Sequence, residues 1–99
     1  MNLSAQDRLS LQRFFAGKPV KRAYLFGSYA RDEADKNSDI DILVELDFSV
    51  HIGLGFIQMK FDLEELLRRK VDLVSEDGLS KYVKPYVDKD KILIYEGAA

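Results

Sequence analysis

Aspartate alternates with aliphatic residues in one short segment of this chain, Asp39-Ile40-Asp41-Ile42-Leu43-Val44. This alternation predicts a β-strand over residues 39–46. Residues two apart on a strand point to the same face, with Cα atoms about 6.5–7 Å apart, so Asp39 and Asp41 lie on one side. Two carboxylates ~5 Å apart repel each other by about 3 kcal/mol at an effective dielectric constant of ~20. An apolar strand has little structural reason to carry that repulsion, so the pair favours a cation-binding site.

A glycine–serine pair precedes the aspartates. Gly27-Ser28 follows an apolar strand predicted for residues 20–26, and ten residues separate Ser28 from Asp39. Glycine lets a backbone approach a phosphate closely, and the first turn of a helix predicted for residues 28–34 would offer free N–H groups. Arg31, one turn into that helix, either reaches a phosphate oxygen or pairs with Asp35 at (i, i+4) spacing.

A third carboxylate, Asp72, lies in an apolar strand predicted for residues 71–75. If this strand lies beside the one that carries Asp41, then Asp39, Asp41 and Asp72 meet at one end of the sheet. Such a cluster suits two-metal phosphoryl transfer, with one ion on a triphosphate and the other on the attacking hydroxyl. The chain has one histidine and no cysteine. Oxygen ligands therefore favour Mg²⁺, or Mn²⁺, over zinc.

Each acidic residue also has a structural interpretation. In that interpretation Asp39 caps a turn, Asp41 lies on an exposed edge, and Asp72 lies at the edge of a strand or pairs with Arg69 or Arg31. The combination of the glycine–serine pair, the three acids and their order along the chain favours the functional interpretation.

The other segments predict one α/β (α+β) domain over residues 1–99, a small mixed β-sheet with helices packed on it. Helices are expected after Ser4, over residues 54–69 and over residues 80–87, with a last strand at 92–95. On the long helix one apolar stripe should face the sheet: Phe56, Met59, Leu63, Leu66 and Leu67. A second group on that helix contacts either a partner or the terminal helices of its own fold: Leu54, Ile57 and Phe61.

Composition excludes several classes of protein. The chain is 46% hydrophobic and 32% charged, which is typical of a folded domain. Its longest apolar runs have four residues, whereas a membrane span needs ~20. A net charge of −2 argues against direct nucleic-acid binding, and the lack of cysteine fits a reducing cytoplasm. No P-loop is present, and Gln58 stands where a dinucleotide fingerprint starting at Gly53 needs glycine.

Gly27-Ser28, Asp39-x-Asp41 and the acid within Val71-Asp72-Leu73-Val74 together resemble the signature of the DNA polymerase beta-like nucleotidyltransferases. Nearly the whole chain is similar to their smallest branch, the minimal nucleotidyltransferase (MNT) domain. The resemblance implies that the three aspartates bind two Mg²⁺ ions, with Asp72 also nearest the attacking hydroxyl. It implies that Gly27 and Ser28, with Arg31 beside them, hold the triphosphate of ATP. Many relatives continue Ala-Arg-Gly where this chain has Ala30-Arg31-Asp32.

Members of this branch are often antitoxins that act with an RNase toxin of the HEPN family. The resemblance implies a Mg²⁺-dependent protein adenylyltransferase of a type VII-like toxin–antitoxin system, transferring AMP from ATP to a tyrosine of the toxin. One alternative is a catalytically weak MNT-fold binding module that neutralises its partner sterically. Another is an enzyme that modifies a small molecule such as an aminoglycoside. Those relatives carry a second, helical domain, for which this chain has no room.

Overall fold

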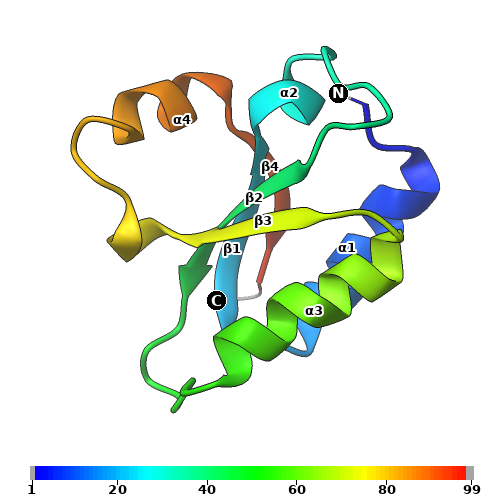
Figure 1. The fold of residues 1–99 in the computed structure, drawn as a ribbon. Coiled ribbons are helices and arrows are strands. Elements are labelled where there is room, and N and C mark those ends of the chain that lie inside the picture. Colours follow the sequence, from blue (N-terminus) through cyan, green and yellow to red (C-terminus); the bar gives the residue numbers. More distant parts are fainter. Residues whose placement is uncertain (1, 98–99) are drawn as a thin grey trace.

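The computed structural model describes residues 2–97 of the chain as a mixed α/β fold (Figure 1). The predicted domain of residues 1–99 therefore includes three positions, 1 and 98–99, that lie outside the described residues. Among residues 2–97, no helix is long and apolar enough to cross a membrane. In chain order the elements are α1 (Ala5–Ala16), β1 (Val20–Phe26), α2 (Gly27–Ala30), β2 (Ile40–Leu46), α3 (Gly55–Leu67), β3 (Val71–Ser75), a 3₁₀ turn (Glu76–Gly78), α4 (Lys84–Asp90) and β4 (Ile92–Glu96).

The four strands form one sheet in the order β3-β2-β1-β4. β1 is antiparallel to both β2 and β4, whereas β2 and β3 are parallel. The parallel pair is joined by α3, which supplies the crossover that a parallel connection needs. The first, second and third strands agree with the predicted ranges to within one residue, and the last extends one residue further.

The main core lies between the sheet and the helices α1 and α3. Leu11 and Phe15 of α1 are fully buried there, against alternate residues of β2 such as Ile42. As predicted, Ser4 caps α1, because its Oγ accepts a hydrogen bond from the backbone N–H of Asp7 at 3.0 Å. The opposite face of β2 therefore carries Asp41, and α4 lies apart from α1 and α3 (Figure 1).

α3 begins one residue later and ends two residues earlier than predicted, and two other helices differ more from their predicted ranges. α2 has one turn rather than extending to residue 34, because Asp32 adopts a left-handed conformation with φ 60°. Aspartate is among the few residues other than glycine that tolerate this conformation. The last helix covers Lys84–Asp90 rather than residues 80–87. Pro85 fits its first turn, where a missing N–H costs nothing.

The apolar stripe of α3 is largely as predicted, with one error. Met59, Leu63 and Leu67 are buried and Phe56 packs partly against the core, but Leu66 is 42% exposed. At 100° per residue, Leu66 lies roughly 65° from the centre of the buried stripe, at its edge. Leu66 therefore faces solvent rather than the core.

Candidate active site

The register of the two parallel strands places two of the predicted acids side by side. Asp41 of β2 is the direct partner of Asp72 of β3, and neighbouring strands lie about 4.8 Å apart. This confirms the prediction that the third strand lies beside the second. Asp39 lies one residue before β2 begins and is exposed, as is Asp72, whereas Asp41 is partly buried.

The glycine of the glycine–serine pair lies directly against this carboxylate. Phe26, the last residue of β1, pairs with Asp41 across the antiparallel ladder. Gly27 then turns with φ +72°, a conformation that favours glycine. A Cβ at this position would overlap Oδ2 of Asp41 and lie 3.1 Å from its Cγ. Two motifs separated along the chain thus form one site.

The charges at this site affect one another. The pKa of Asp41 is raised from 3.8 to about 6, most of all by burial and then by the negative charges of Asp72 and Asp39, while the positive charge of Arg31 partly offsets the rise. The three carboxylates are therefore within electrostatic reach of each other. A divalent cation would relieve both the repulsion and the cost of burying the charge.

Arg31 lies at the end of α2, where its backbone N–H donates to the carbonyl of Gly27 at 3.1 Å. Its guanidinium forms ion pairs with Glu33 and Asp90 rather than with Asp35. Asp35 instead organises the turn before β2, since its carboxylate accepts a hydrogen bond from the backbone N–H of Asn37 at 2.8 Å.

The residues present fit a hard divalent cation by their chemistry. All three acids supply oxygen ligands, and their mutual repulsion shows a concentration of negative charge at one end of the sheet. Within residues 2–97, no three His, Cys, Asp or Glu side chains are arranged to hold an ion together in this conformation. The assignment of Asp39, Asp41 and Asp72 as metal ligands stays a prediction.

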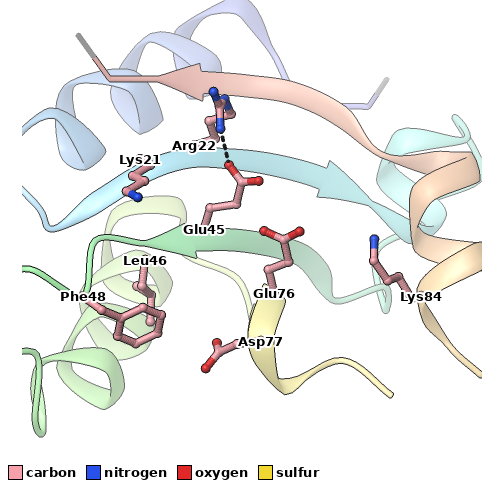
Figure 2. A pocket seen from close by; sticks show the side chains of 8 residues that line it. All are labelled: Lys21, Arg22, Glu45, Leu46, Phe48, Glu76, Asp77 and Lys84. Atoms are coloured by element: carbon pink, nitrogen blue, oxygen red, sulfur yellow. Dashed lines mark hydrogen bonds and ion pairs between the residues drawn. The ribbon is translucent and has the colours of Figure 1, made fainter. Parts of the chain in front are cut away.

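A second polar cluster, which the sequence interpretation missed, lies further along β2. Glu45 is on the same face of the strand as Asp41, roughly 13 Å away at 3.3 Å per residue. Figure 2 shows Glu45 between Arg22, whose guanidinium donates to it at 2.9 Å, and the carboxyl group of Glu76. Hydrogen bonding to Glu45 raises the pKa of Glu76. The alternation from Asp41 through Glu45 was the available signal for this cluster.

These side chains border a shallow pocket of about 440 Å³ (Figure 2). Its lining residues are Lys21, Arg22, Glu45, Leu46, Phe48, Glu76, Asp77 and Lys84. None of the predicted site residues is among them, so the pocket is distinct from the Gly27–Asp41 site.

The requirement for ionised Asp41 predicts a pH dependence of cation binding. Its raised pKa of about 6 means that protonation competes with a cation as the pH falls through 6. We expect the apparent Mg²⁺ affinity to fall about tenfold for each pH unit below that value if one proton is displaced. Isothermal titration with Mg²⁺ across this range measures the effect. An affinity independent of pH would contradict a role for Asp41 as a ligand.

Residues 8–94 match the nucleotidyltransferase domain family. A Methanocaldococcus jannaschii protein, named as a candidate protein adenylyltransferase, is 43% identical over 65 residues, covering 66% of this chain and 69% of that protein. The protein adenylyltransferase MntA of Thermococcus cleftensis is 36% identical over 75 residues, covering 76% of this chain and 75% of that protein.

Solved structures show the same fold. A structure assigned as a minimal nucleotidyltransferase is 36% identical with a TM-score of 0.65, covering 88% of this chain and 85% of that one. A toxin–antitoxin structure with AMP-PNP gives a TM-score of 0.76 at 23% identity, covering 90% and 73%. A tri-AMPylated Shewanella oneidensis HEPN toxin in complex with MNT antitoxin gives 0.69 at 20% identity, covering 92% and 71%. At those two lower identities the similarity is one of fold.

The motif order, the strand register that joins the acids to Gly27, and the matches in sequence and fold agree. The chain belongs to the nucleotidyltransferase domain family, within the minimal nucleotidyltransferases that are related to the archaeal protein adenylyltransferases.

Proposed function

We propose that this chain is the antitoxin of a toxin–antitoxin pair and that it acts in the cytoplasm as a Mg²⁺-dependent protein adenylyltransferase. Its substrates would be ATP and a tyrosine of a HEPN-family RNase toxin, which AMP transfer inactivates. The observation that carries the enzymatic part is the strand register that sets Asp41 beside Asp72 and directly under Gly27. Relatives named as protein adenylyltransferases support the same reaction.

The chemistry assigns a role to each predicted residue. Gly27, Ser28 and Arg31 hold the triphosphate, the first two through the N–H groups of a single turn of helix. Asp39, Asp41 and Asp72 hold the divalent cations, which lower the pKa of the attacking hydroxyl and neutralise developing charge.

The transfer of AMP is a displacement at the α-phosphorus of ATP. The tyrosine oxygen forms a bond to the α-phosphorus of ATP, the bond from that phosphorus to the bridging oxygen of the β-phosphate breaks, and pyrophosphate leaves. Asp72 is the carboxylate nearest the incoming hydroxyl in this proposal, and it accepts the phenolic proton. Its exposure, in contrast with the partly buried Asp41, leaves it accessible to an acceptor that another protein presents.

A protein acceptor also needs a contact surface. Leu54, Ile57 and Phe61 of the α3 region are 81%, 53% and 54% exposed. Their exposure shows that the terminal elements of residues 2–97 do not cover them, which removes one of the two interpretations given above. The structure with MNT antitoxin bound to a HEPN toxin, which is similar in fold, supports a toxin of that kind as the partner.

Substitution of Asp72 tests the proposed base. Because Asp72 is exposed, Asp72→Asn should change the free energy of unfolding by less than about 0.5 kcal/mol. Loss of one cation ligand and of the base should lower the rate of AMP transfer by at least ~10²-fold. Rates with purified partner and urea unfolding measure the two effects, with Asp88→Asn on the exposed side of α4 as the control. A variant with the native rate would remove Asp72 from the mechanism.

The acceptor is tested on the partner. Tandem mass spectrometry of the partner after incubation with the enzyme, Mg²⁺ and ATP should find AMP on a tyrosine, and the matching Tyr→Phe partner should stay active as a toxin. AMP on another residue type would correct the acceptor. Full neutralisation of the partner by the Asp41→Asn protein, without modification, would favour the steric binding module instead.

A further inference from the structure

Arg31 donates hydrogen bonds to three separate parts of the fold. Its backbone N–H donates to the carbonyl of Gly27, its Nε donates to Glu33 at 3.1 Å, and its Nη1 donates to Asp90 at 2.5 Å. The hydrogen bonds to Gly27 and Glu33 are local, whereas Asp90 is 59 residues away along the chain. The hydrogen bond to Asp90 therefore exists only because α4 folds beside α2 (Figure 1).

The hydrogen bond to Asp90 is the shorter and better shielded of the two that the Arg31 side chain makes. The Asp90 side chain is 20% exposed, compared with 64% for Glu33. Solvent weakens exposed ion pairs, and charged hydrogen bonds are strongest when they are short and shielded. Asp90 thus does most to fix where the guanidinium lies.

The fixed guanidinium retains the capacity to bind an anion. It is planar and carries five N–H donors, and the two hydrogen bonds engage Nε and Nη1. The backbone of Arg31 is hydrogen-bonded to Gly27 at 3.1 Å, and Gly27 lies directly against the carboxylate of Asp41. Arg31 is therefore held beside the Gly27–Asp41 site, where the proposed function puts the triphosphate.

We propose that Asp90 is a positioning residue, which from the end of α4 holds the Arg31 guanidinium beside Gly27 so that its remaining donors meet the triphosphate of the bound nucleotide. This inference rests on the proposed function for the nucleotide and goes beyond it in assigning a role to α4. A guanidinium fixed before binding loses less conformational freedom on contact with phosphate. This role differs from two others that Asp90 could have: an ion pair that only stabilises the fold, and a carboxylate that competes with phosphate for Arg31.

The test measures ATP affinity directly, by titration calorimetry in the presence of Mg²⁺, alongside KM and kcat for AMP transfer. Asp90→Asn should weaken ATP binding and raise KM by about tenfold, the loss expected when one charged hydrogen bond no longer orients its partner. Because Asp90 acts on binding, kcat should change by less than about threefold. Asp90→Glu, which keeps the charge, should recover part of the affinity.

The matched control is Asp88→Asn, two residues away on the same helix. Asp88 also forms ion pairs, with Lys84 at 2.9 Å and Lys91 at 3.0 Å, but not with Arg31. This variant should keep the native affinity. Thermal unfolding of both variants separates a loss of affinity from a loss of fold.

A double-mutant cycle decides whether Asp90 acts through Arg31. In an Arg31→Gln background, Asp90→Asn should change ATP affinity by less than about twofold. An equal loss in both backgrounds, unchanged affinity in Asp90→Asn, or tighter binding in that variant would each overturn the proposal, the last in favour of competition. A native protein that binds ATP but transfers no AMP would overturn the proposed function alone, and one that binds no ATP would overturn both.

Discussion

Asp41→Asn is expected to abolish AMP transfer while making the cation-free protein more stable. The substitution removes an anionic ligand from the point where the two strands and Gly27 meet. Metal stabilisation of a transition state amounts to several kcal/mol, so the rate should fall by at least ~10²-fold. An enzyme that kept its rate would show that Asp41 is not part of the active site.

The gain in stability follows from the raised pKa of Asp41. The carboxyl group holds its proton up to about pH 6 in the folded protein, against 3.8 ordinarily. The folded state therefore binds more protons than the unfolded state between these values, and stability falls as the pH rises through this window. Above it the full penalty is present, about 1–2 kcal/mol after a discount for the solvent that reaches this partly buried group.

Thermal unfolding in the presence of a chelator measures this penalty. Near pH 7, Asp41→Asn should melt roughly 4–10 °C above the native protein. Below about pH 3, where the carboxyl group is protonated in both states, the difference should disappear. Added Mg²⁺ should stabilise the native protein and not the variant, because it binds only where the charge remains. A variant that melts below the native protein at both pH values would contradict this account of the site.

Gly27→Ala should displace the carboxylate of Asp41 without changing its charge. The new Cβ would overlap Oδ2 of Asp41 and lie 3.1 Å from Cγ, so the carboxylate must rotate away. The φ of +72° adds backbone strain, about 1–2 kcal/mol for a residue with a side chain. We expect a ~10²-fold loss of AMP transfer, because positioning errors of about 1 Å have effects of that size.

Gly78→Ala is the matched control for that substitution. A Cβ on Gly78 would meet nothing within 4 Å. Stability should change by less than about 0.5 kcal/mol, and the rate of transfer should stay within about twofold of native. Gly27→Ala with a native rate would mean that its contact with Asp41 does not serve the reaction.

Local patterns in the sequence were sufficient to predict the parts of the site that lie on regular strands. The alternation at Asp39 and Asp41 and the apolar neighbours of Asp72 identified both strands, because side-chain direction on a strand follows from its period of two. The sequence alone did not establish that these two strands are neighbours in the sheet. It is the observed register that sets Asp41 beside Asp72 and brings these two acids together.

The contacts of Arg31 could not be predicted from the sequence, for two physical reasons. Aspartate at position 32 gives no strong stop signal, yet its φ of 60° ends α2 after one turn. The predicted last helix stopped at residue 87, whereas α4 continues to Asp90. The sequence therefore offered a phosphate oxygen or Asp35, four residues on, as the partner of Arg31, and not a carboxylate from the other end of the chain.

The proposed activity is transfer of a nucleotidyl group by the Gly27–Asp41–Asp72 site. The most direct measurement incubates the purified protein with Mg²⁺ and lysate of its source, in parallel with ATP labelled at the α-phosphate and at the γ-phosphate. Our account predicts label on a protein band only from α-labelled ATP, and none with Asp41→Asn. Label from γ-labelled ATP, or label that persists in Asp41→Asn, would contradict it.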